Sequence, residues 1–407
     1  MSEMSYLEKL LDGVEVEWLP LGKLGELVRG NGLPKSDFTE SGVPAIHYGQ
    51  IYTFYGLSTE TTKSFVSHET AKKLKKVNSG DVVITNTSEN FTDVGKALVY
   101  LGKEQAVTGG HATIFKPNST IIGKYFAYFT QTDSFANEKR KYSKGTKVID
   151  VSASDMAKII IPIPCPENPE NSLAIQSEIV RILDKFTALT AELTAELTAE
   201  LTMRKKQYNY YRDQLLSFEQ GEVEWKMLGD LGENLDSKRK PITSGLREAG
   251  SIPYYGASGI VDYVKDYIFD GDFLLISEDG ANLLARNTPI AFSISGKSWV
   301  NNHAHVIKFD SYAERRYVEY YLNSIDLAPY ISGAAQPKLN KKNLESIRIP
   351  NPSPEDKERI VSILDKFDAL TNSINEGLPR EIELRQKQYE YYRDLLFSFP
   401  RPETASN

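Results

Sequence analysis

The chain has 407 residues, of which 40% are hydrophobic and 25% are charged, and its formal net charge is −7. This length allows two or more domains, and the apolar content is ordinary for a globular protein. The single cysteine, Cys165, excludes an internal disulfide and favours a reducing, cytoplasmic location. Apolar runs fall short of the ~18 residues of a membrane span, and the acidic N-terminal segment does not read as a signal peptide.

The negative charge is unevenly distributed. Residues 22–158 contain 18 Lys and Arg against 13 Asp and Glu, whereas residues 229–348 contain 14 against 15. The acidity therefore lies mostly in the remaining segments. A mildly basic first region can meet phosphates, but ordinary surface charge explains the same counts.

The N-terminal segment, residues 1–21, looks like the end of a repeat that begins elsewhere in the chain. Its GVEVEW, residues 13–18, resembles GEVEW at residues 221–225, and each is preceded by a Tyr and two consecutive Leu, in YLEKLL and YRDQLL. The beginning of that repeat helix lies at the other end of the chain, in residues 385–399. We expect residues 1–21 to pack beside that C-terminal helix, which gives a circular organisation.

Two globular domains are predicted, at residues 22–158 and 229–348. Short β-rich runs such as VVIT, FLLIS and HVIKF alternate with Gly- and Asn-containing loops, which is typical of compact, mainly β or mixed domains. The two regions also match each other. Gly80-Asp aligns with Gly271-Asp, TGGHA with VNNHA, and residues 145–162 align with 333–350 at a constant offset of 188.

The central segment, residues 159–228, predicts one long helix after a proline-rich boundary. No Gly or Pro interrupts residues 172–218, and TAEL is written three times in residues 190–201. Ala, Glu and Leu are strong helix formers, so a helix of up to ~45 residues is expected, ~65 Å long. The C-terminal segment, residues 349–407, predicts a helical counterpart that breaks near Gly377 and Pro379.

The two helical segments are copies. Residues 179–190 match 360–371 and residues 204–218 match 385–399, all at an offset of 181. We expect an α+β protein in which two homologous domains are joined by an antiparallel helical pair with pseudo-twofold symmetry. The apolar stripes of the two copies are expected to bury against each other; they comprise Ile179, Ile182, Phe186 and Leu189, and Ile360, Ile363, Phe367 and Leu370.

This ordered set of LDKF, RxKQYxYYRD and TAEL segments around two variable domains resembles the specificity subunit of type I restriction–modification enzymes. The resemblance covers essentially the whole chain, and the TAEL array resembles the IC subfamily in particular. It implies that each globular domain is a target-recognition domain that reads one half of a split double-stranded DNA sequence. It further implies that the helices form an antiparallel coiled coil, which holds the domains at a fixed separation and binds two methyltransferase subunits.

The resemblance also implies a chain that is not catalytic alone. Motor–nuclease subunits complete the restriction enzyme, and S-adenosylmethionine, ATP and Mg²⁺ are used by the partner subunits, so no cofactor is expected here. The residues agree: the Asn/Asp-Pro-Pro-Tyr/Phe methylase motif is missing, and position 291 is Ala where a P-loop ending in Gly296-Lys297-Ser298 would need glycine. Five histidines and one cysteine are too scattered to predict a metal site.

Candidate DNA-binding residues are the hydrogen-bonding side chains of loops that follow predicted strands, because such groups read base edges. In the first domain they are His47, Tyr48, Gln50, Asn86, Ser88, Asn90, His111, Lys144 and Lys147. In the second they are Lys238, Arg239, Tyr254, Tyr255, Glu278, Asn282, Asn301, Asn302, Gln336 and Lys338. Ordinary turn chemistry explains the same composition.

For several features the sequence supports both a structural and a DNA-binding interpretation. His111 and His303 occupy matched positions, which suits structural support or DNA contact. The basic run at residues 72–76 suits a solvated helix face or phosphate contact, and the repeated Tyr-Tyr-Arg-Asp suits helix packing and a partner surface or nucleic acid. At the level of function, the alternatives are a duplicated coiled-coil scaffold whose domains bind proteins or glycans, and a fused enzyme with its own methylase.

Overall fold

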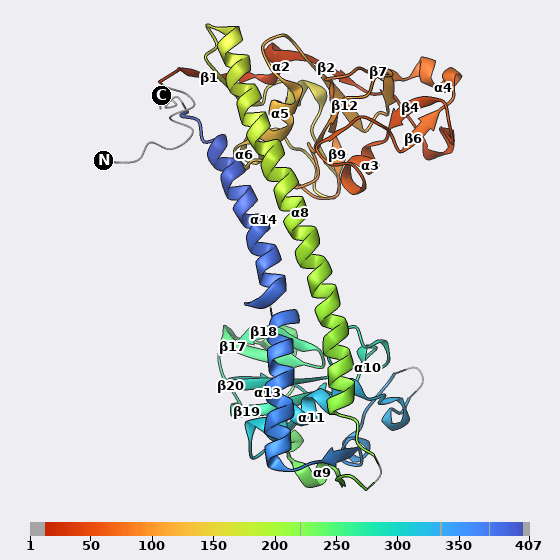
Figure 1. Ribbon diagram of the computed structural model, residues 1–407, viewed down its shortest axis with the longest axis vertical. Helices are drawn as coiled ribbons and strands as arrows, with labels where there is room; N and C mark the ends of the chain where they lie inside the picture. Colours follow the sequence, from red (N-terminus) through yellow and green to blue (C-terminus); the bar gives the residue numbers. More distant parts are fainter. Residues whose placement is uncertain (1–12, 220, 334–335, 374, 402–407) are drawn as a thin grey trace. The chain divides into compact units, whose positions relative to one another are not determined.

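The computed structural model describes residues 13–219, 221–333, 336–373 and 375–401. Its contacts divide the chain into two compact units, which are Met1–Ala195 with Glu383–Asn407, and Glu196–Ile382. Each unit contains one globular domain and parts of the long helices (Figure 1). No helix of the described residues is long and apolar enough to cross a membrane.

The first globular domain is built on two five-stranded sheets. One has the order β2-β12-β8-β10-β5 and the other β3-β6-β4-β11-β7. Central strands such as Val82–Thr85 are buried at every position, so their continuous apolar run reflects burial on both faces. The strands are β1 Val16–Pro20, β2 Gly25–Arg29, β3 Phe38–Thr39, β4 Val43–Ile46, β5 Ser58–Thr59, β6 Ser64–Val66, β7 Lys75–Val77, β8 Val82–Thr85, β9 Thr87–Ser88, β10 Ala97–Tyr100, β11 Ala106–Thr108, β12 Ala112–Pro117, β13 Ile149–Asp150 and β14 Ile160–Pro164.

Short helices connect these strands. They are α2 Leu21–Leu24, α3 Tyr48–Thr53, α4 His68–Lys73, α5 Gly123–Phe129, α6 Asp133–Arg140 and α7 Ala153–Met156. Several begin at a hydroxyl N-cap, as α4 does where Ser67 accepts from the Thr70 amide at 3.1 Å. The basic run at residues 72–76 falls on the end of α4 and on β7, and most of its side chains are exposed.

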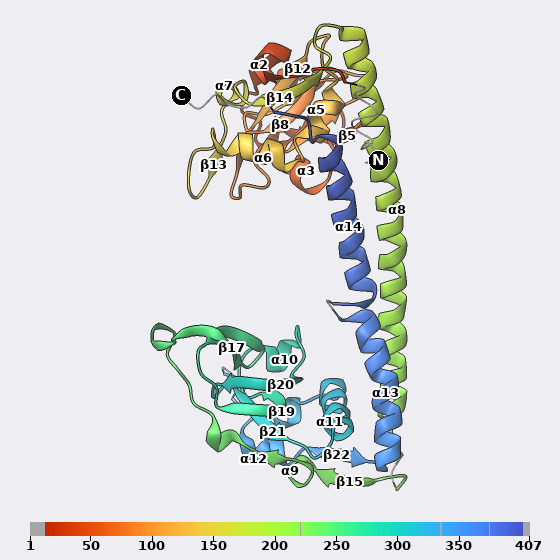
Figure 2. The same cartoon turned by 90° about the vertical axis from the view of Figure 1, so that its left-hand side faces the viewer.

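The second globular domain carries a six-stranded sheet of order β16-β21-β19-β20-β17-β18. Its strands are β15 Glu224–Met227, β16 Glu233–Asn234, β17 Ala249–Gly256, β18 Gly259–Val264, β19 Phe269–Ser277, β20 Ala291–Val300, β21 Ala304–Lys308 and β22 Arg348–Asn351. Its helices are α9 Leu228–Leu231, α10 Asn282–Ala285, α11 Tyr312–Ser324 and α12 Lys341–Glu345. Helix α11 lies between this sheet and helix α13 (Figure 2).

The long helices agree with the sequence prediction. Helix α8 runs without interruption over Pro169–Leu215, 47 residues. The C-terminal copy is divided into α13 Pro354–Thr371 and α14 Gly377–Leu396, so the predicted break at Gly377 is confirmed. Gly377 has a φ of +76°, in the left-handed region that glycine tolerates and other residues rarely adopt.

Each domain is held on a long helix by the same pair of contacts. In the first unit, Lys124 and Tyr128 of α5 donate to the Asp184 carboxylate at 2.8 and 2.7 Å. In the second unit, Arg316 and Tyr320 of α11 donate to Asp365 at 3.0 and 2.6 Å. Both pairs of positions are separated by 192 residues and the two aspartates by 181, so the docking itself is duplicated.

The helix stripes pack differently from the prediction. Ile179 and Leu183 are buried in the core of the first domain, and Ile360 and Leu364 in that of the second. The expectation that the stripes bury against each other is therefore wrong for these residues. The physical reason is that each domain covers its helix stripe with its own apolar residues, among them Tyr125, Phe126 and Phe129 of α5 in the first core.

The antiparallel pairing of the helices uses aromatic residues instead. In the first unit Phe186 stacks on Tyr392 at 5.6 Å between ring centroids, and in the second Phe367 stacks on Tyr211 at 5.8 Å. Thr187 also donates to the Tyr389 hydroxyl at 3.1 Å, so numbers rise along α8 while they fall along α14. Each stack joins the same two repeat positions, so the same antiparallel contact occurs once in each unit.

The two ends of the chain meet in the first unit. The Trp18 indole donates to the Pro400 carbonyl at 2.8 Å, and the Arg401 guanidinium lies 4.5 Å from the Trp18 ring. Leu396, Phe397 and Phe399 belong to the same core as the first domain. The part of the N-terminal prediction that concerns residues 1–12 lies outside the described residues.

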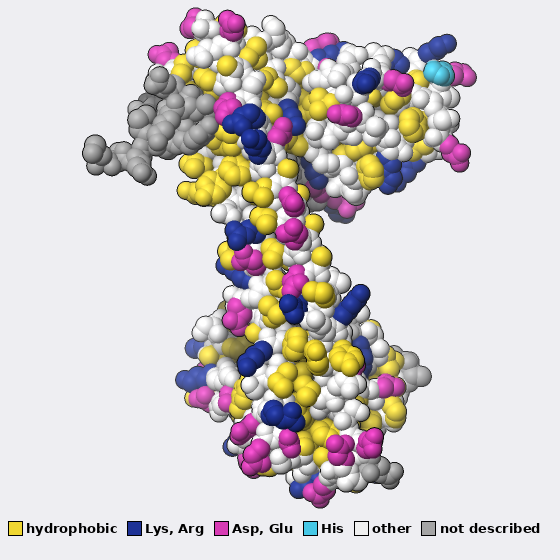
Figure 3. Space-filling model, in the orientation of Figure 1, with side chains coloured by type: hydrophobic (Ala, Val, Ile, Leu, Met, Phe, Trp, Pro, Cys, Tyr) yellow, Lys and Arg dark blue, Asp and Glu magenta, His cyan; other side chains and the backbone are white. Residues whose placement is uncertain are grey.

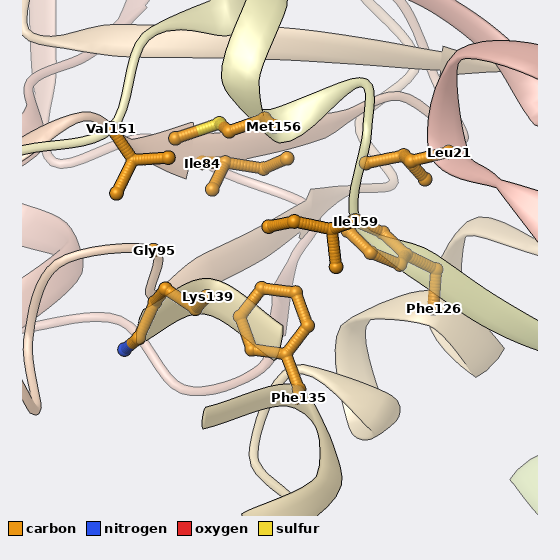
Figure 4. Close-up of a pocket in the computed structure, with 9 residues that line it drawn as sticks. All are labelled: Leu21, Ile84, Gly95, Phe126, Phe135, Lys139, Val151, Met156 and Ile159. Atoms are coloured by element: carbon orange, nitrogen blue, oxygen red, sulfur yellow. The ribbon is translucent and has the colours of Figure 1, made fainter. Parts of the chain in front are cut away.

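A buried lysine lies at a small apolar pocket of the first domain (Figure 4). Lys139 of α6 is 4% exposed, and its ammonium donates to the carbonyls of Phe91 and Val94 at 2.9 and 2.6 Å. Burial lowers its pKa to about 8. The side chain therefore ties the loop after β9 to the core without a carboxylate partner at hydrogen-bond distance.

Candidate nucleic-acid interface

Three loops meet at one edge of the first domain. They are the loop after β8, the loop before β12 and the hairpin that ends in β13. The Asn86 amide donates to the His111 carbonyl at 2.9 Å, and the Asn86 carbonyl accepts from the Val151 amide at 2.9 Å. Strand β9 also pairs with β13, where Ile149 faces Ser88. Four loops were predicted to read DNA in this domain, and three of them are joined here by backbone hydrogen bonds.

The second domain joins the equivalent loops in the same way. The Glu278 amide donates to the His303 carbonyl at 2.9 Å, and the Glu278 carbonyl accepts from the Leu339 amide at 2.7 Å. A bridge between Asp279 and Lys338 adds the hairpin. The same backbone frame therefore supports the candidate loops of both domains.

The strand registers define which positions are equivalent. Val83 faces Ile114 in the first domain and Leu275 faces Val306 in the second, an offset of 192 on both strands. The alignment of Gly80 with Gly271 has an offset of 191 and is thus wrong by one residue. It matched the two glycines, whereas the strand pairing requires an offset of 192. The predicted offset of 188 is confirmed where Trp18 faces Pro162 and Trp225 faces Pro350.

The hairpins of the two domains also share one turn. Gly145 and Gly333 have φ values of +97° and +83°, and a Cβ at either would come within 2.5 Å of the carbonyl oxygen three residues later. Lys144 pairs with Asp150 and Ser332 with Lys338. Both positions therefore require glycine.

The first predicted loop of domain 1 supports its own helix. His47 is 8% exposed and caps α3, with its Nδ1 accepting from the Gly49 amide at 3.1 Å. Burial, Lys35 and His111 lower its pKa. Gln50 completes this capping box and donates to the Ser64 hydroxyl at 2.5 Å. Tyr48 lies between the His47 and His111 rings, at 4.6 and 4.7 Å.

The loop after β8 contains both enclosed and exposed candidates. Asn86 is fully buried and accepts from the Thr113 hydroxyl at 2.7 Å, while its Nδ2 has no hydrogen-bond partner among the described residues. Ser88 is half-buried and Asn90 is exposed. Asn90 is engaged by Asp93, which accepts from its amide group at 2.8 Å.

The remaining candidates of domain 1 are exposed. His111 lies with its Nδ1 3.1 Å from the Thr87 hydroxyl. Lys144 and Lys158 pair with Asp155 at 2.9 and 2.8 Å, and these bonds, that of Lys158 foremost, hold the pKa of the Asp155 carboxyl well below its ordinary value. Lys147 lies exposed on the hairpin.

An ion-pair network lies beneath the loops of domain 2. Glu278 is 8% exposed and accepts from Arg239 at 2.6 Å and from Lys338 at 3.0 Å. Burial opposes ionisation of Glu278, but Arg239 and Lys338 hold its pKa below the ordinary value. Three predicted candidates are therefore joined in one cluster, in which one carboxylate is shared by two cations.

His305 extends this network into the core. Its Nδ1 lies 2.6 Å from the Asp236 carboxylate and its Nε2 lies 2.7 Å from the Leu339 carbonyl. Both ring nitrogens of His305 therefore lie within hydrogen-bond distance of an oxygen atom. Burial raises the pKa of Asp236, but His305 outweighs it and the pKa lies below the ordinary value.

Asp236, Glu278 and His305 also form the group of described residues that could hold a metal ion, with ligand atoms within 4.8 Å of one another. Arg239 already binds both carboxylates of this group, at 3.4 Å for Asp236 and 2.6 Å for Glu278. The protein's own cations thus take the positions that a metal would take. We interpret the group as a structural network.

The other candidates of domain 2 divide by exposure. Tyr254 is 1% exposed, and its hydroxyl accepts from the Ile242 amide at 2.9 Å. Asn301 is buried and accepts from the His303 amide at 2.8 Å, which shapes that loop. Tyr255 and Asn282 are half-buried, and three candidates are exposed: Lys238, Asn302 and Gln336.

Some candidates therefore do not protrude as the sequence analysis expected. Asn301 and Tyr254 are enclosed because their polar groups complete the hydrogen bonding of the loops, whereas Asn86 is enclosed against Thr113 of β12. Asp236, Asp279 and His305 belong to the same loop networks but were not predicted from the sequence. His305 lies in an apolar strand, which gives no sign of its polar contacts. Only the 192-residue offset between the domains could have pointed to these residues, because it pairs Thr87 with Asp279 and Thr113 with His305.

The comparisons with known proteins agree with this duplicated architecture. The family model "Type I restriction modification DNA specificity domain" matches residues 13–203 and 221–384. The chain belongs to this family. It is 42% identical to the specificity subunit of the type I restriction enzymes EcoR124I/EcoR124II from Escherichia coli, over 100% of both chains. It is 38% identical to the EcoprrI specificity subunit of the same species, over 92% of this chain and 93% of the relative.

Solved structures support the fold. A chain from the structural study of complex assembly and conformational transition of the type I R-M system matches with a TM-score of 0.62 at 16% identity, over 94% of this chain and 97% of that one. The HsdS subunit from Thermoanaerobacter tengcongensis matches with a TM-score of 0.50 at 16% identity, over 94% and 95%. At these identities the likeness concerns the fold alone.

Proposed function

We propose that this chain is the DNA-recognition subunit of a type I restriction–modification enzyme, and that it supplies no catalysis of its own. Each globular domain reads one half of a bipartite duplex sequence. The observation that carries the proposal is the duplicated loop frame, in which one backbone arrangement presents different polar side chains in each domain. A reader of two unlike half-sites needs this combination of constant frame and variable surface.

The helical segments are the proposed binding surface for two methyltransferase subunits. Within the first unit Leu384, Tyr391 and Tyr392 are exposed by 39% or more, and within the second unit Met203, Tyr210 and Tyr211 by 47% or more. These six residues are three repeat positions, each present twice at the offset of 181. Hydrophobic side chains gather along the helices on the face seen in Figure 3. Exposed apolar residues on a helix mark a protein interface, and a duplicated patch suits two copies of one partner.

The finer parts of this proposal rest on the resemblance. Motor and nuclease subunits join the complex for restriction, and the partner subunits use S-adenosylmethionine, ATP and Mg²⁺. The chain works in the cytoplasm, which the single half-buried Cys165 suits. The IC-like assignment stays a prediction from the TAEL array.

The decisive experiment is to map methylated adenines in DNA from cells that express this chain with its cognate methyltransferase subunits. A split sequence with a fixed gap is expected. Replacing residues 22–158 by those of a relative should change one half of that sequence and leave the other intact. A scaffold that binds proteins or glycans would give no methylation pattern, and a change in both halves would show that the domains do not read independently.

A further inference from the structure

His111 and His303 are the matched pair that the two loop frames keep in common. Each directly precedes a strand, β12 or β21, and the carbonyl oxygen of each accepts the same frame hydrogen bond at 2.9 Å. Each Nδ1 is bound to the equivalent residue of the neighbouring loop. The partner is Thr87 at 3.1 Å in the first domain and Asp279 at 2.9 Å in the second.

Both histidines are at the surface. His111 is exposed, and the His303 side chain is 51% exposed. Among the described residues, neither Nε2 has a hydrogen-bond partner. A ring that is held through Nδ1 and has an open Nε2 is a pre-oriented hydrogen-bonding group, so an incoming ligand orders it at little cost in side-chain entropy.

The surrounding side chains differ between the domains. The equivalent positions carry Asn and Glu at 86 and 278, Thr and Asp at 87 and 279, Gly and Asn at 110 and 302, and Asp and Lys at 150 and 338. A residue that selects a base should change with the sequence that is read, as these positions do. A contact to the phosphate backbone can stay the same, since the phosphate is identical in every half-site.

We propose that His111 and His303 are matched contacts to the DNA phosphate backbone, one in each recognition domain, which fix the register of each domain without selecting a base. This inference rests on the proposed function. It separates the candidate loops into a constant anchoring group and a variable reading group. It also accounts for the exposure of both rings, which a role confined to packing leaves unexplained.

Asparagine and glutamine variants test this directly. An Asn side chain ends near the position of Nδ1 and keeps the bond to Thr87 or Asp279, whereas a Gln side chain reaches toward the position of Nε2. Affinity is measured for the full chain with its methyltransferase subunits, on a duplex that carries the mapped sequence and on one with both half-sites scrambled. We expect about 3- to 10-fold weaker binding for H111N or H303N alone, the same on both duplexes.

The double Asn variant should lose about 10- to 100-fold, H111Q and H303Q should lie closer to wild type, and the methylated sequence should not change. H68N is the control, because His68 is exposed at the start of α4 and takes no part in the loop frame. If the Asn variants bind DNA with wild-type affinity, the histidines only support the loops, and the inference is overturned. A changed base in one half-site would also overturn it. A wild-type complex that binds neither duplex would instead refute the proposed function.

Discussion

Asn86 and Glu278 occupy the same place in the two recognition domains, yet their surroundings have opposite character. Asn86 meets a neutral Thr113, and no charged side chain of the described residues binds its amide group. Glu278 is bound by Arg239 and Lys338 above a buried His305. The backbone bonds of the two positions agree within 0.2 Å, so the frame is independent of the charge that it encloses. Recognition surfaces can therefore diverge in chemistry without rebuilding the fold.

The two domains also stabilise buried cations differently. Domain 2 pairs Arg239 with two carboxylates. Domain 1 buries Lys139 against backbone carbonyls, and its pKa falls to about 8 as a result. The comparison predicts that mutations at equivalent positions act equally where the frame is shared, and unequally where the charges differ.

The largest effect is expected where the halves are most alike. Leu183 and Leu364 are fully buried at equivalent positions of α8 and α13. Leu183→Asp or Leu364→Asp removes a core side chain, which costs ~2–5 kcal/mol, and adds a buried carboxylate. We expect aggregated protein or loss of methyltransferase binding in both variants, measured by size-exclusion chromatography of the co-expressed complex.

The matched controls are Lys185→Asp and Lys366→Asp, two residues further along each helix, where the side chains are exposed. These variants should form the complex as wild type does. If the leucine variants assemble equally well, the docking of each domain on its long helix does not depend on this core.

The second prediction concerns the difference between the domains. Glu278→Ala removes the carboxylate that Arg239 and Lys338 share, but Arg239 keeps Asp236, so the loss should be about 1.5–3 kcal/mol. Asn86→Ala removes one hydrogen bond, and the loss should be about 1 kcal/mol. Hydrogen exchange in the loops of each domain measures both effects. Equal losses would show that the charge network adds nothing to the frame.

The duplication and the long helices follow from the sequence, because repeats and periodic apolar residues report them directly. The ion-pair network does not. Its members Asp236, Glu278, His305 and Lys338 lie far apart in the chain, and each reads as an ordinary loop or strand residue. The stripe partners were also mistaken, since an apolar face does not say which apolar surface will cover it.

The third prediction uses the unpaired cation of domain 1. The pKa of Lys139 is about 8 in the folded protein against an ordinary 10.5, so the unfolded chain binds more protons between pH 8 and 10.5. The contribution of Lys139 to stability should therefore rise across this window, by up to about 3 kcal/mol. Comparing the pH dependence of thermal unfolding for wild type and Lys139→Met isolates the effect. A constant difference between the two proteins would contradict the lowered pKa.

A smaller, symmetric effect is expected in the helical pair. Phe186 and Phe367 stack on Tyr392 and Tyr211 with nearly the same geometry. Replacing either Phe by Leu keeps apolar volume but removes the stacking, which is worth about 0.5–1.5 kcal/mol. The two variants should lower the melting temperature by similar amounts. A clear inequality would show that the two halves of the pair are not energetically equivalent.

The smallest effect on stability, with a distinct effect on function, is expected from the TAEL array. The segment Thr198–Leu201 is one unit of α8, and removing it shortens a continuous helix by ~6 Å and turns its remainder by about 40°. No loop of either recognition domain is touched, so both half-sites should stay the same. Base pairs are spaced ~3.4 Å apart, and the gap between the half-sites should therefore shrink by about one to two base pairs. Mapping methylated sites for chains with two, three and four units measures this gap. The same gap in all three would mean that α8 does not set the spacing and that TAEL is a solvated filler.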